Sequence, residues 1–408
     1  MGFSVEQECP QCGAPIDLDE TDHLIVCPYC NIKNYLFAQD YFRFLLPHKA
    51  PGRDIIYAPY MRFKGEVYLC KGATIDHSIV DITYQGAAFR QLPISLGLRP
   101  QAMKMKFVTP DVRGSFLKCF LRPLDVLANI GKRTSIFSTG KLFHRTYIGE
   151  TFSIIFLPIF MQGGRVFDAV INRPIAKLPN GEDIFPLAGE ENSTWRITFM
   201  ATICPQCGWD LDGERDSVVL TCANCDTVWE ASEGRLIQVD FSVVPGKGND
   251  LEYLPFWKIT VRDEGLGINT HADFIRIIRR PMVMQRGWEN EELSFWIPAF
   301  KIRPKVLLRL ATEMTILQQD FAMDKQIPKN NLYPVTLPKG EAAQSLKVTL
   351  ASAVMTKREF FPLLPQINFT ITKFNLIYLP FKAKGPDMIQ EDLGINVNKN
   401  VLKYGRSL

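Results

Sequence analysis

The sequence of 408 residues lacks the features that would place it in a membrane or a secretory pathway. Its start, MGFSVEQECP, has neither the basic region nor the apolar run of a signal peptide. The longest apolar run, FSIIFLPIFM at 152–161, is far shorter than the roughly 20 residues of a bilayer span, and it predicts a buried strand. We therefore predict a cytoplasmic chain without a transmembrane segment, and a peripheral membrane contact stays open.

An excess of one charge and the motifs of common enzymes are also missing. The 47 Lys and Arg face 43 Asp and Glu, and the resulting net charge of +4 indicates no class of partner by itself. STGKLF at 138–143 lacks the upstream glycine of a phosphate-binding loop and the Ser or Thr after its lysine. Dinucleotide, zinc-protease and serine-hydrolase motifs are absent as well. We predict that the protein is not an enzyme.

Eight of the ten cysteines form two sets with the same spacing, in which two Cys-x-x-Cys pairs are separated by 14 residues. Each pair presents two thiolates on one side of a tight turn, and two such turns complete a tetrahedron around a soft divalent ion. A glycine after the first pair of each set supplies a permissive backbone. The predicted metal ligands are Cys9, Cys12, Cys27 and Cys30 in the first set and Cys204, Cys207, Cys222 and Cys225 in the second.

Both segments, CPQCGAPIDLDETDHLIVCPYC at 9–30 and CPQCGWDLDGERDSVVLTCANC at 204–225, resemble the zinc-ribbon family. The resemblance covers about 25–30 residues in each copy and leaves the rest of the chain unassigned. It implies two zinc ions per chain. Since four thiolates leave no open position for water or substrate, both ions are expected to be structural.

Other uses of paired cysteines fit less well. A thioredoxin-like dithiol needs one Cys-x-x-Cys in a βαβ setting, and a disulfide framework suits a small secreted chain. CPQCG also resembles the iron-binding turns of rubredoxins, although these proteins carry a much longer insert between the two turns. A rubredoxin-like electron carrier therefore stays as an alternative.

The second set of cysteines brings a second copy of the surrounding sequence. The two 22-residue segments share eight identical positions. Further on, YAPYMRF at 57–63 parallels YLPFWKI at 253–259, and LPISLGLRPQAMKMK at 92–106 parallels IPAFKIRPKVLLRL at 297–310. FSIIFLPIFMQGGRVFDAVINRP at 152–174 parallels FNLIYLPFKAKGPDMIQEDLGINV at 374–397. Matched segments in one order predict a repeated unit of about 200 residues.

We therefore predict an α+β fold of two duplicated modules, each a four-cysteine zinc ribbon followed by a β-rich unit with a few helices. The predicted ranges are 1–36 and 201–233 for the ribbons, and 37–200 and 234–408 for the β-rich units. Apolar residues at three- and four-residue steps predict helices at 114–133, 304–321 and 340–360.

Prolines among β-branched and aromatic residues predict further strands. Because proline cannot donate to a strand ladder, each should lie at a strand edge, start or bulge. The aromatic residues beside them either line a ligand groove or fill the core between sheet and helices. The prolines concerned are Pro59, Pro93, Pro158, Pro255, Pro298 and Pro380.

Charge is distributed unevenly along the chain. Residues 1–30 hold six Asp or Glu and no Lys or Arg, so the first ribbon should repel phosphate. Residues 90–145 hold eleven Lys or Arg against two Asp, a net charge of +9. This basic stretch binds RNA, anionic lipid or an acidic protein face, or it merely balances the acidic ribbons. The candidate anion- or partner-binding residues are Arg99, Lys104, Lys106, Arg113 and Lys118.

The sequence thus predicts a non-enzymatic, zinc-binding scaffold or adaptor that mediates protein–protein interactions in a larger assembly. The partner proteins are not identified by any motif. A nucleic-acid-binding protein that uses residues 90–145 is the first alternative, and a rubredoxin-like electron carrier is the second.

Overall fold

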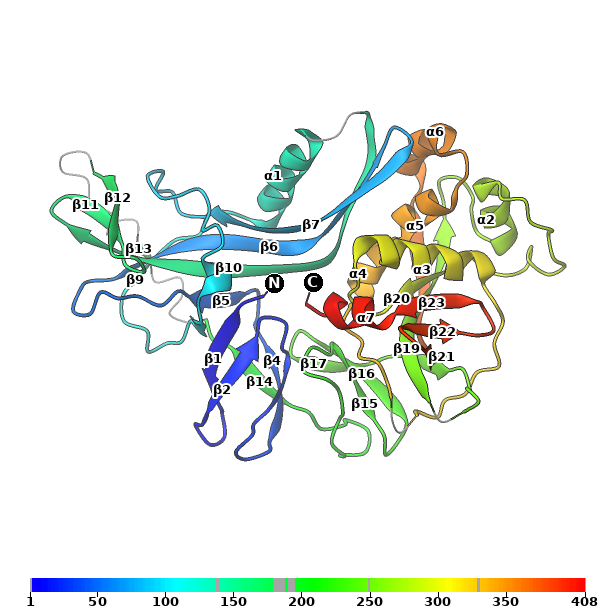
Figure 1. The fold of residues 1–408 in the computed structure, drawn as a ribbon, viewed down its shortest axis with the longest axis horizontal. Helices are drawn as coiled ribbons and strands as arrows, with labels where there is room; N and C mark the ends of the chain where they lie inside the picture. Colours follow the sequence, from blue (N-terminus) through cyan, green and yellow to red (C-terminus); the bar gives the residue numbers. More distant parts are fainter. Residues whose placement is uncertain are drawn as a thin grey trace.

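A computed structural model describes residues 2–136, 140–178, 188–189, 195–248, 250–328 and 331–407. Figure 1 shows long strands of the first half reaching across to a second half that carries most of the helices, with both ribbons along the same edge of the molecule. The chain is a strand-rich mixture of strands and helices. Among the described residues, no helix is long and apolar enough to cross a membrane.

The first half is built on the long antiparallel strands β6 (Ile56–Lys71), β7 (Thr74–Gln85) and β10 (Leu142–Gln162). β6 lies between β7 and β10, and the short strand β5 (Phe42–Leu45) runs parallel to β10 on its other side. Shorter strands extend this sheet. They are β1 (Ser4–Glu8), β2 (Pro15–Asp19), β8 (Met105–Phe107), β9 (Ser115–Leu117), β11 (Arg165–Asp168), β12 (Arg173–Lys177) and β13 (Ala188–Gly189).

The second half has a smaller sheet covered by helices. β19 (Leu251–Asp263) pairs with β21 (Phe369–Lys384), and β20 (Ser294–Pro298) and β18 (Phe241–Val243) flank this pair. The remaining strands are β22 (Asp387–Gln390) and β23 (Ile395–Asn398). The helices are α2 (His271–Ile278), α3 (Pro304–Leu317), α4 (Lys339–Gln344), α5 (Leu346–Ala353), α6 (Lys357–Phe360), the 3-10 helix η3 (Phe361–Gln366) and α7 (Lys399–Gly405).

The central strands of the two halves share one order and one register. Tyr57 of β6 lies opposite Pro158 of β10, and Tyr253 of β19 lies opposite Pro380 of β21. β5 and β18 occupy equivalent places beside these strands, as do β7 and β20, and the hairpin of β10 and β11 matches that of β21 and β22 residue by residue. Matched pairs are Pro59–Phe156 with Pro255–Tyr378, Leu45–Phe156 with Val243–Tyr378, Arg62–Thr83 with Lys258–Trp296, and Gln162–Arg165 with Lys384–Asp387.

Pro158 and Pro380 lie inside central strands, at positions where one neighbouring strand has stopped pairing. The sequence did not predict this arrangement. Pro158 follows the residues of β10 that pair with β5 and precedes those that pair with β11, so one side of the strand has no ladder partner there. Pro380 occupies the same break between β18 and β22. The missing N–H is therefore tolerated at the centre of a sheet. Pro93 was expected in a strand but lies outside one, where its carbonyl accepts the Tyr60 hydroxyl at 2.8 Å.

One predicted helix is shorter than expected. Residues 115–117 form β9, and α1 (Pro123–Ile136) begins at Pro123. Proline suits the first turn of a helix but breaks its interior, so a helix over 114–133 could not pass through this residue. The helices predicted at 304–321 and 340–360 correspond to α3 and to the run from α4 to α6. α3 has no α-helical counterpart at 92–106, where only the short 3-10 helix η1 (Pro100–Ala102) precedes β8.

The two halves share a hydrophobic core. Tyr68 and Cys70 at the far end of β6, and Ile148 on β10, are buried among apolar residues of the second half. The Thr146 hydroxyl donates to the Gln344 carbonyl at 2.9 Å across this junction. The long strands therefore anchor the first half on the second.

Candidate metal centres

Each ribbon has a three-stranded sheet that carries its second cysteine pair, and the first pair of the first ribbon lies in the turn between β1 and β2. The sheet of the first ribbon contains β3 (Leu24–Val26), β4 (Lys33–Phe37) and β14 (Thr198–Ala201), and that of the second contains β15 (Val219–Cys222), β16 (Thr227–Ser232) and β17 (Arg235–Gln238). β14 comes from the segment just before the second ribbon, so the chain crosses the first ribbon before it enters the second. Their hairpins have matching registers, Leu24–Tyr35 in the first and Val219–Glu230 in the second.

Each set of four cysteines converges on one point. All four sulfur atoms of a set lie within 4.8 Å of one another. The Sγ–Sγ distances are 3.7 Å for Cys9–Cys30 and for Cys12–Cys27. They are 3.7 Å for Cys204–Cys225 and 3.5 Å for Cys207–Cys222.

These distances fit a metal and not a disulfide. Sulfur atoms about 2.3 Å from a tetrahedral zinc ion are about 3.8 Å apart, whereas a disulfide bond measures about 2.05 Å. None of the ten cysteines forms a disulfide. The two clusters can each hold one metal ion, consistent with two zinc ions per chain.

The four Cys-x-x-Cys turns close in the same way. The residue that follows each turn has a left-handed backbone, with φ of 73° at Gly13, 57° at Asn31, 74° at Gly208 and 49° at Asp226. Glycine, Asn and Asp are the residues that adopt this conformation most readily. The sequence pointed to the two glycines, and Asn31 and Asp226 carry the same signal for the second turn of each ribbon.

Hydrogen bonds favour the thiolate form, which binds metal, at Cys27 and Cys204, whereas the pKa of Cys30 and Cys225 is raised. Backbone N–H groups of Cys30 and Tyr29 lower the pKa of Cys27 to about 6. In the second cluster the Thr227 hydroxyl lies 3.2 Å from Cys225 Sγ and accepts the Trp229 indole N–H at 2.9 Å. Both sites are closed by four protein ligands, so they suit a structural ion.

The ribbons pack against each other through their strands. Leu24 and Tyr35 of the first ribbon share an apolar cluster with Leu220 and Trp229 of the second, beside the buried ligand Cys222. Polar contacts surround this cluster. The His23 and Leu24 N–H groups donate to the Arg215 carbonyl at 2.7 and 2.8 Å, Arg215 pairs with Asp22 at 2.5 Å, and Lys33 pairs with Asp212 at 2.7 Å.

The candidate residues of the basic stretch lie in different surroundings. Arg99 forms an ion pair with the buried Asp168. Lys104 pairs with Asp17 and Lys106 with Glu6, at 3.8 Å for the second pair, and both partners belong to the first ribbon. Arg113 and Lys118 are exposed around β9, with the Lys118 ammonium 5.7 Å from the centre of the Phe120 ring.

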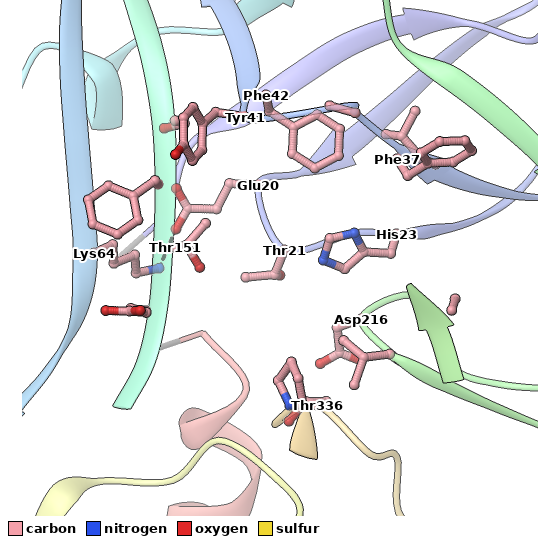
Figure 2. A pocket seen from close by; sticks show the side chains of 18 of the residues that line it. Glu20, Thr21, His23, Phe37, Tyr41, Phe42, Lys64, Thr151, Asp216 and Thr336 are labelled. Atoms are coloured by element: carbon pink, nitrogen blue, oxygen red, sulfur yellow. Dashed lines mark hydrogen bonds and ion pairs between the residues drawn. The ribbon is translucent and has the colours of Figure 1, made fainter. Parts of the chain in front are cut away.

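A cavity of about 400 Å³ between the ribbons and the two halves could not be found by sequence reasoning. Its lining comes from distant parts of the chain, including Glu20, His23, Asp216 and Glu341. Figure 2 shows Tyr41, Phe42 and Phe37 along one side and Asp216 and Thr336 on the other. Glu20, His23 and Asp216 lie between the cysteine pairs of the ribbons, but the cysteine spacing assigns no role to the residues in between, so the sequence carries no signal for this site.

Comparisons with family models, with curated proteins and with solved structures found no match for this chain. The likeness to zinc ribbons therefore rests on the cysteine spacing and on the two clusters that the fold assembles.

Proposed function

We propose that the protein is a non-enzymatic scaffold whose two zinc ions keep a protein-binding surface in shape. The packing of one ribbon on the other, beside the two closed four-thiolate clusters, is the observation that carries this proposal. Ions with four protein ligands stabilise a fold and offer no position for substrate. Zinc at each ribbon would therefore fix the junction on which both halves meet.

The surface that we assign to partners lies at the cysteine turns. Tyr29 sits inside a turn of the first ribbon and is 68% exposed, and Trp209 follows a turn of the second and is 61% exposed. Val26 and Ile203 are exposed near them. Large aromatic side chains of this kind dominate binding energy at protein interfaces. A protein partner is therefore the proposed ligand.

The charge distribution supports protein over nucleic acid. Arg99, Lys104 and Lys106 are paired with carboxylates of the same chain, so their charge is already partly neutralised. Binding to phosphate relies on cations that release counterions, and paired cations contribute less to it. Nucleic-acid binding through 90–145 and electron transfer by bound iron remain the competing functions.

We also infer that the chain arose by duplication of one ribbon and one β-rich unit. The ribbons would span 1–36 and 201–233, and the β-rich units 37–200 and 234–408. The matching registers of the ribbon hairpins and of the central strands support this inference. The helical coverage of β20 by α3 and the longer reach of β6 and β10 would then be later differences between the copies.

Replacing Tyr29 and Trp209 with serine is expected to release a co-purifying protein while leaving zinc content unchanged. The native assembly should be measured by sedimentation before and after nuclease treatment. Val283→Ser is the matched control, because Val283 is 88% exposed but lies outside the ribbons. An assembly that survives the double substitution but dissolves with nuclease, or after Arg113→Glu and Lys118→Glu, would favour nucleic acid instead.

A further inference from the structure

The cavity between the ribbons has the size of a small-molecule site. Its volume of about 400 Å³ falls within the roughly 300–1,000 Å³ of ligand pockets. One wall is aromatic, with Tyr41, Phe42, Phe44 and Phe152 from the first half. The opposite wall includes Asp216 of the second ribbon and Thr336 of the second half (Figure 2). A bound molecule would contact both halves at once.

Much of the charge around this cavity is already paired. Glu20 forms ion pairs with Arg62 and Lys64. Asp216 accepts two hydrogen bonds from the Arg406 guanidinium, one of them at 2.8 Å. Asp40 and Glu230 pair with Arg43 and Lys339 outside the lining. Among the described residues this leaves Glu150, Glu233 and Glu341 without an ion pair against the single cation Lys301, so the cavity favours a positively charged occupant.

Three side-chain oxygens of residues that line the cavity have neither a hydrogen bond nor an ion pair among the described residues. They are the Oε2 atoms of Glu150 and Glu341 and the Oγ atom of Ser153, and all three are buried. Ser153 is only 3% exposed. Buried acceptors without a partner are unfavourable, so each is a position where a ligand donor would gain a hydrogen bond.

Burial and the neighbouring Glu150 both act on the carboxyl group of Glu341. Burial raises the pKa of Glu341 to about 7, and the nearby Glu150 adds to this, while Lys301 and the N–H groups of Glu150 and Gly149 oppose it. Burial also raises the pKa of Glu150. Removing two carboxyl groups from water favours their neutral forms, whereas an added positive charge would favour their ionised forms.

We propose that this cavity binds a small organic cation, an amine with an aromatic or apolar body, whose ammonium group is held by Glu150, Glu341 and Ser153. An ammonium group has three donors, and the site offers three unpartnered acceptors. The aromatic wall would cover the body of the ligand and attract its charge. The rival ligand is a zwitterion, such as an amino acid, whose carboxylate would face Lys301.

Calorimetry on the full zinc-loaded chain tests this site with three probes that share a phenyl ring on a two-carbon chain. Phenethylamine carries the charge, 2-phenylethanol is its neutral counterpart and phenylalanine is the zwitterion. We expect phenethylamine to bind at least tenfold more tightly than either of the others. Equal binding of the alcohol would show that the cavity recognises only the apolar body of the ligand. Tighter binding of phenylalanine would show that the cavity prefers a zwitterion to a cation. Either result overturns the proposal.

Isosteric variants locate the binding groups. Glu341→Gln and Glu150→Gln should each weaken phenethylamine binding at least tenfold. Neither change should destabilise the unliganded chain, because each removes a buried ionisable group while keeping its shape. Glu66→Gln is the matched control: Glu66 is also a buried carboxyl group with a raised pKa, but it lies outside the lining and accepts the Tyr68 hydroxyl at 2.5 Å. Ser153→Ala provides a second test should a glutamine variant fail to fold, and unchanged affinity in Glu341→Gln or in Ser153→Ala would contradict the site.

Affinity for the amine should also fall as the pH drops below about 7. The amine pairs with ionised carboxylates, and Glu341 with its pKa of about 7 takes up a proton over this range. One displaced proton gives about a tenfold loss per pH unit. The half-buried His23 should not contribute, since burial lowers its pKa to about 4. The other charged groups around the cavity are Glu20, Asp40, Arg62, Lys64, Glu150, Asp216, Glu230, Glu233, Lys301 and Arg406. A flat profile between pH 6 and 8 would contradict this assignment.

Discussion

Cys222→Ser is expected to unfold the second ribbon and to expose the neighbouring strands β3 and β4 of the first ribbon. Cys222 is fully buried at the junction and belongs to the apolar cluster with Leu24 and Tyr35. A structural zinc site contributes about 10–16 kcal/mol to the fold that binds it, which rivals the roughly 5–15 kcal/mol that stabilises a whole domain. Loss of one thiolate should therefore remove the metal and open the ribbon.

Hydrogen exchange measured by mass spectrometry, together with zinc analysis, would test this result. Protection should be lost over 201–238 and also over β3 and β4, with one zinc ion remaining per chain. Cys119→Ser is the control, because Cys119 lies outside both clusters. Full retention of zinc would show that Cys222 is not a ligand. Loss of protection confined to 201–238 would show that the two ribbons do not stabilise each other.

Glu20→Ala is expected to destabilise the chain by about 3–5 kcal/mol, because it leaves buried cations without their partner. The side chains of Glu20, Arg62 and Lys64 are 7%, 4% and 6% exposed. Arg62 would keep its two hydrogen bonds to Asp81, at 2.7 and 2.8 Å. Lys64 would keep only the Ser407 carbonyl at 2.9 Å among its described partners, so most of the cost falls on this lysine.

A double variant separates the lost ion pair from lost packing. Adding Lys64→Met to Glu20→Ala should restore much of the stability, measured as the midpoint of denaturant unfolding, because the unpaired charge is then gone. Burial already lowers the pKa of Lys64. In Glu20→Ala the folded state should bind fewer protons than the unfolded state, so stability should rise with pH as Lys64 loses its charge. A loss below 0.5 kcal/mol, a value typical of exposed pairs, would contradict the buried network.

The metal clusters were predictable because their signal is local. The spacing of the eight cysteines fixes which sulfur atoms can meet, and the left-handed residues after each turn close the geometry. The strands around Pro158 and Pro380 were also predictable from their flanking residues. Their position inside a sheet was not, since it depends on where β5, β11, β18 and β22 stop pairing.

Neither the pairing of the charged residues nor the central cavity could be predicted from the sequence. A count of charges along residues 1–30 and 90–145 cannot reveal that Lys104 and Lys106 pair with Asp17 and Glu6 of the first ribbon. Likewise, Glu150 and Glu341 are far apart in the chain and meet only because β10 reaches the second half. Such contacts depend on tertiary packing and produce no periodic pattern of residue types in the sequence.

Each chain should hold two structural zinc ions. Elemental analysis of the purified native protein, combined with X-ray absorption at the metal edge, tests this most directly. We expect a zinc-to-chain ratio of two and four sulfur neighbours about 2.3 Å from each ion. Iron as the main metal, with visible colour, or a ratio of one with oxygen or nitrogen neighbours, would contradict it.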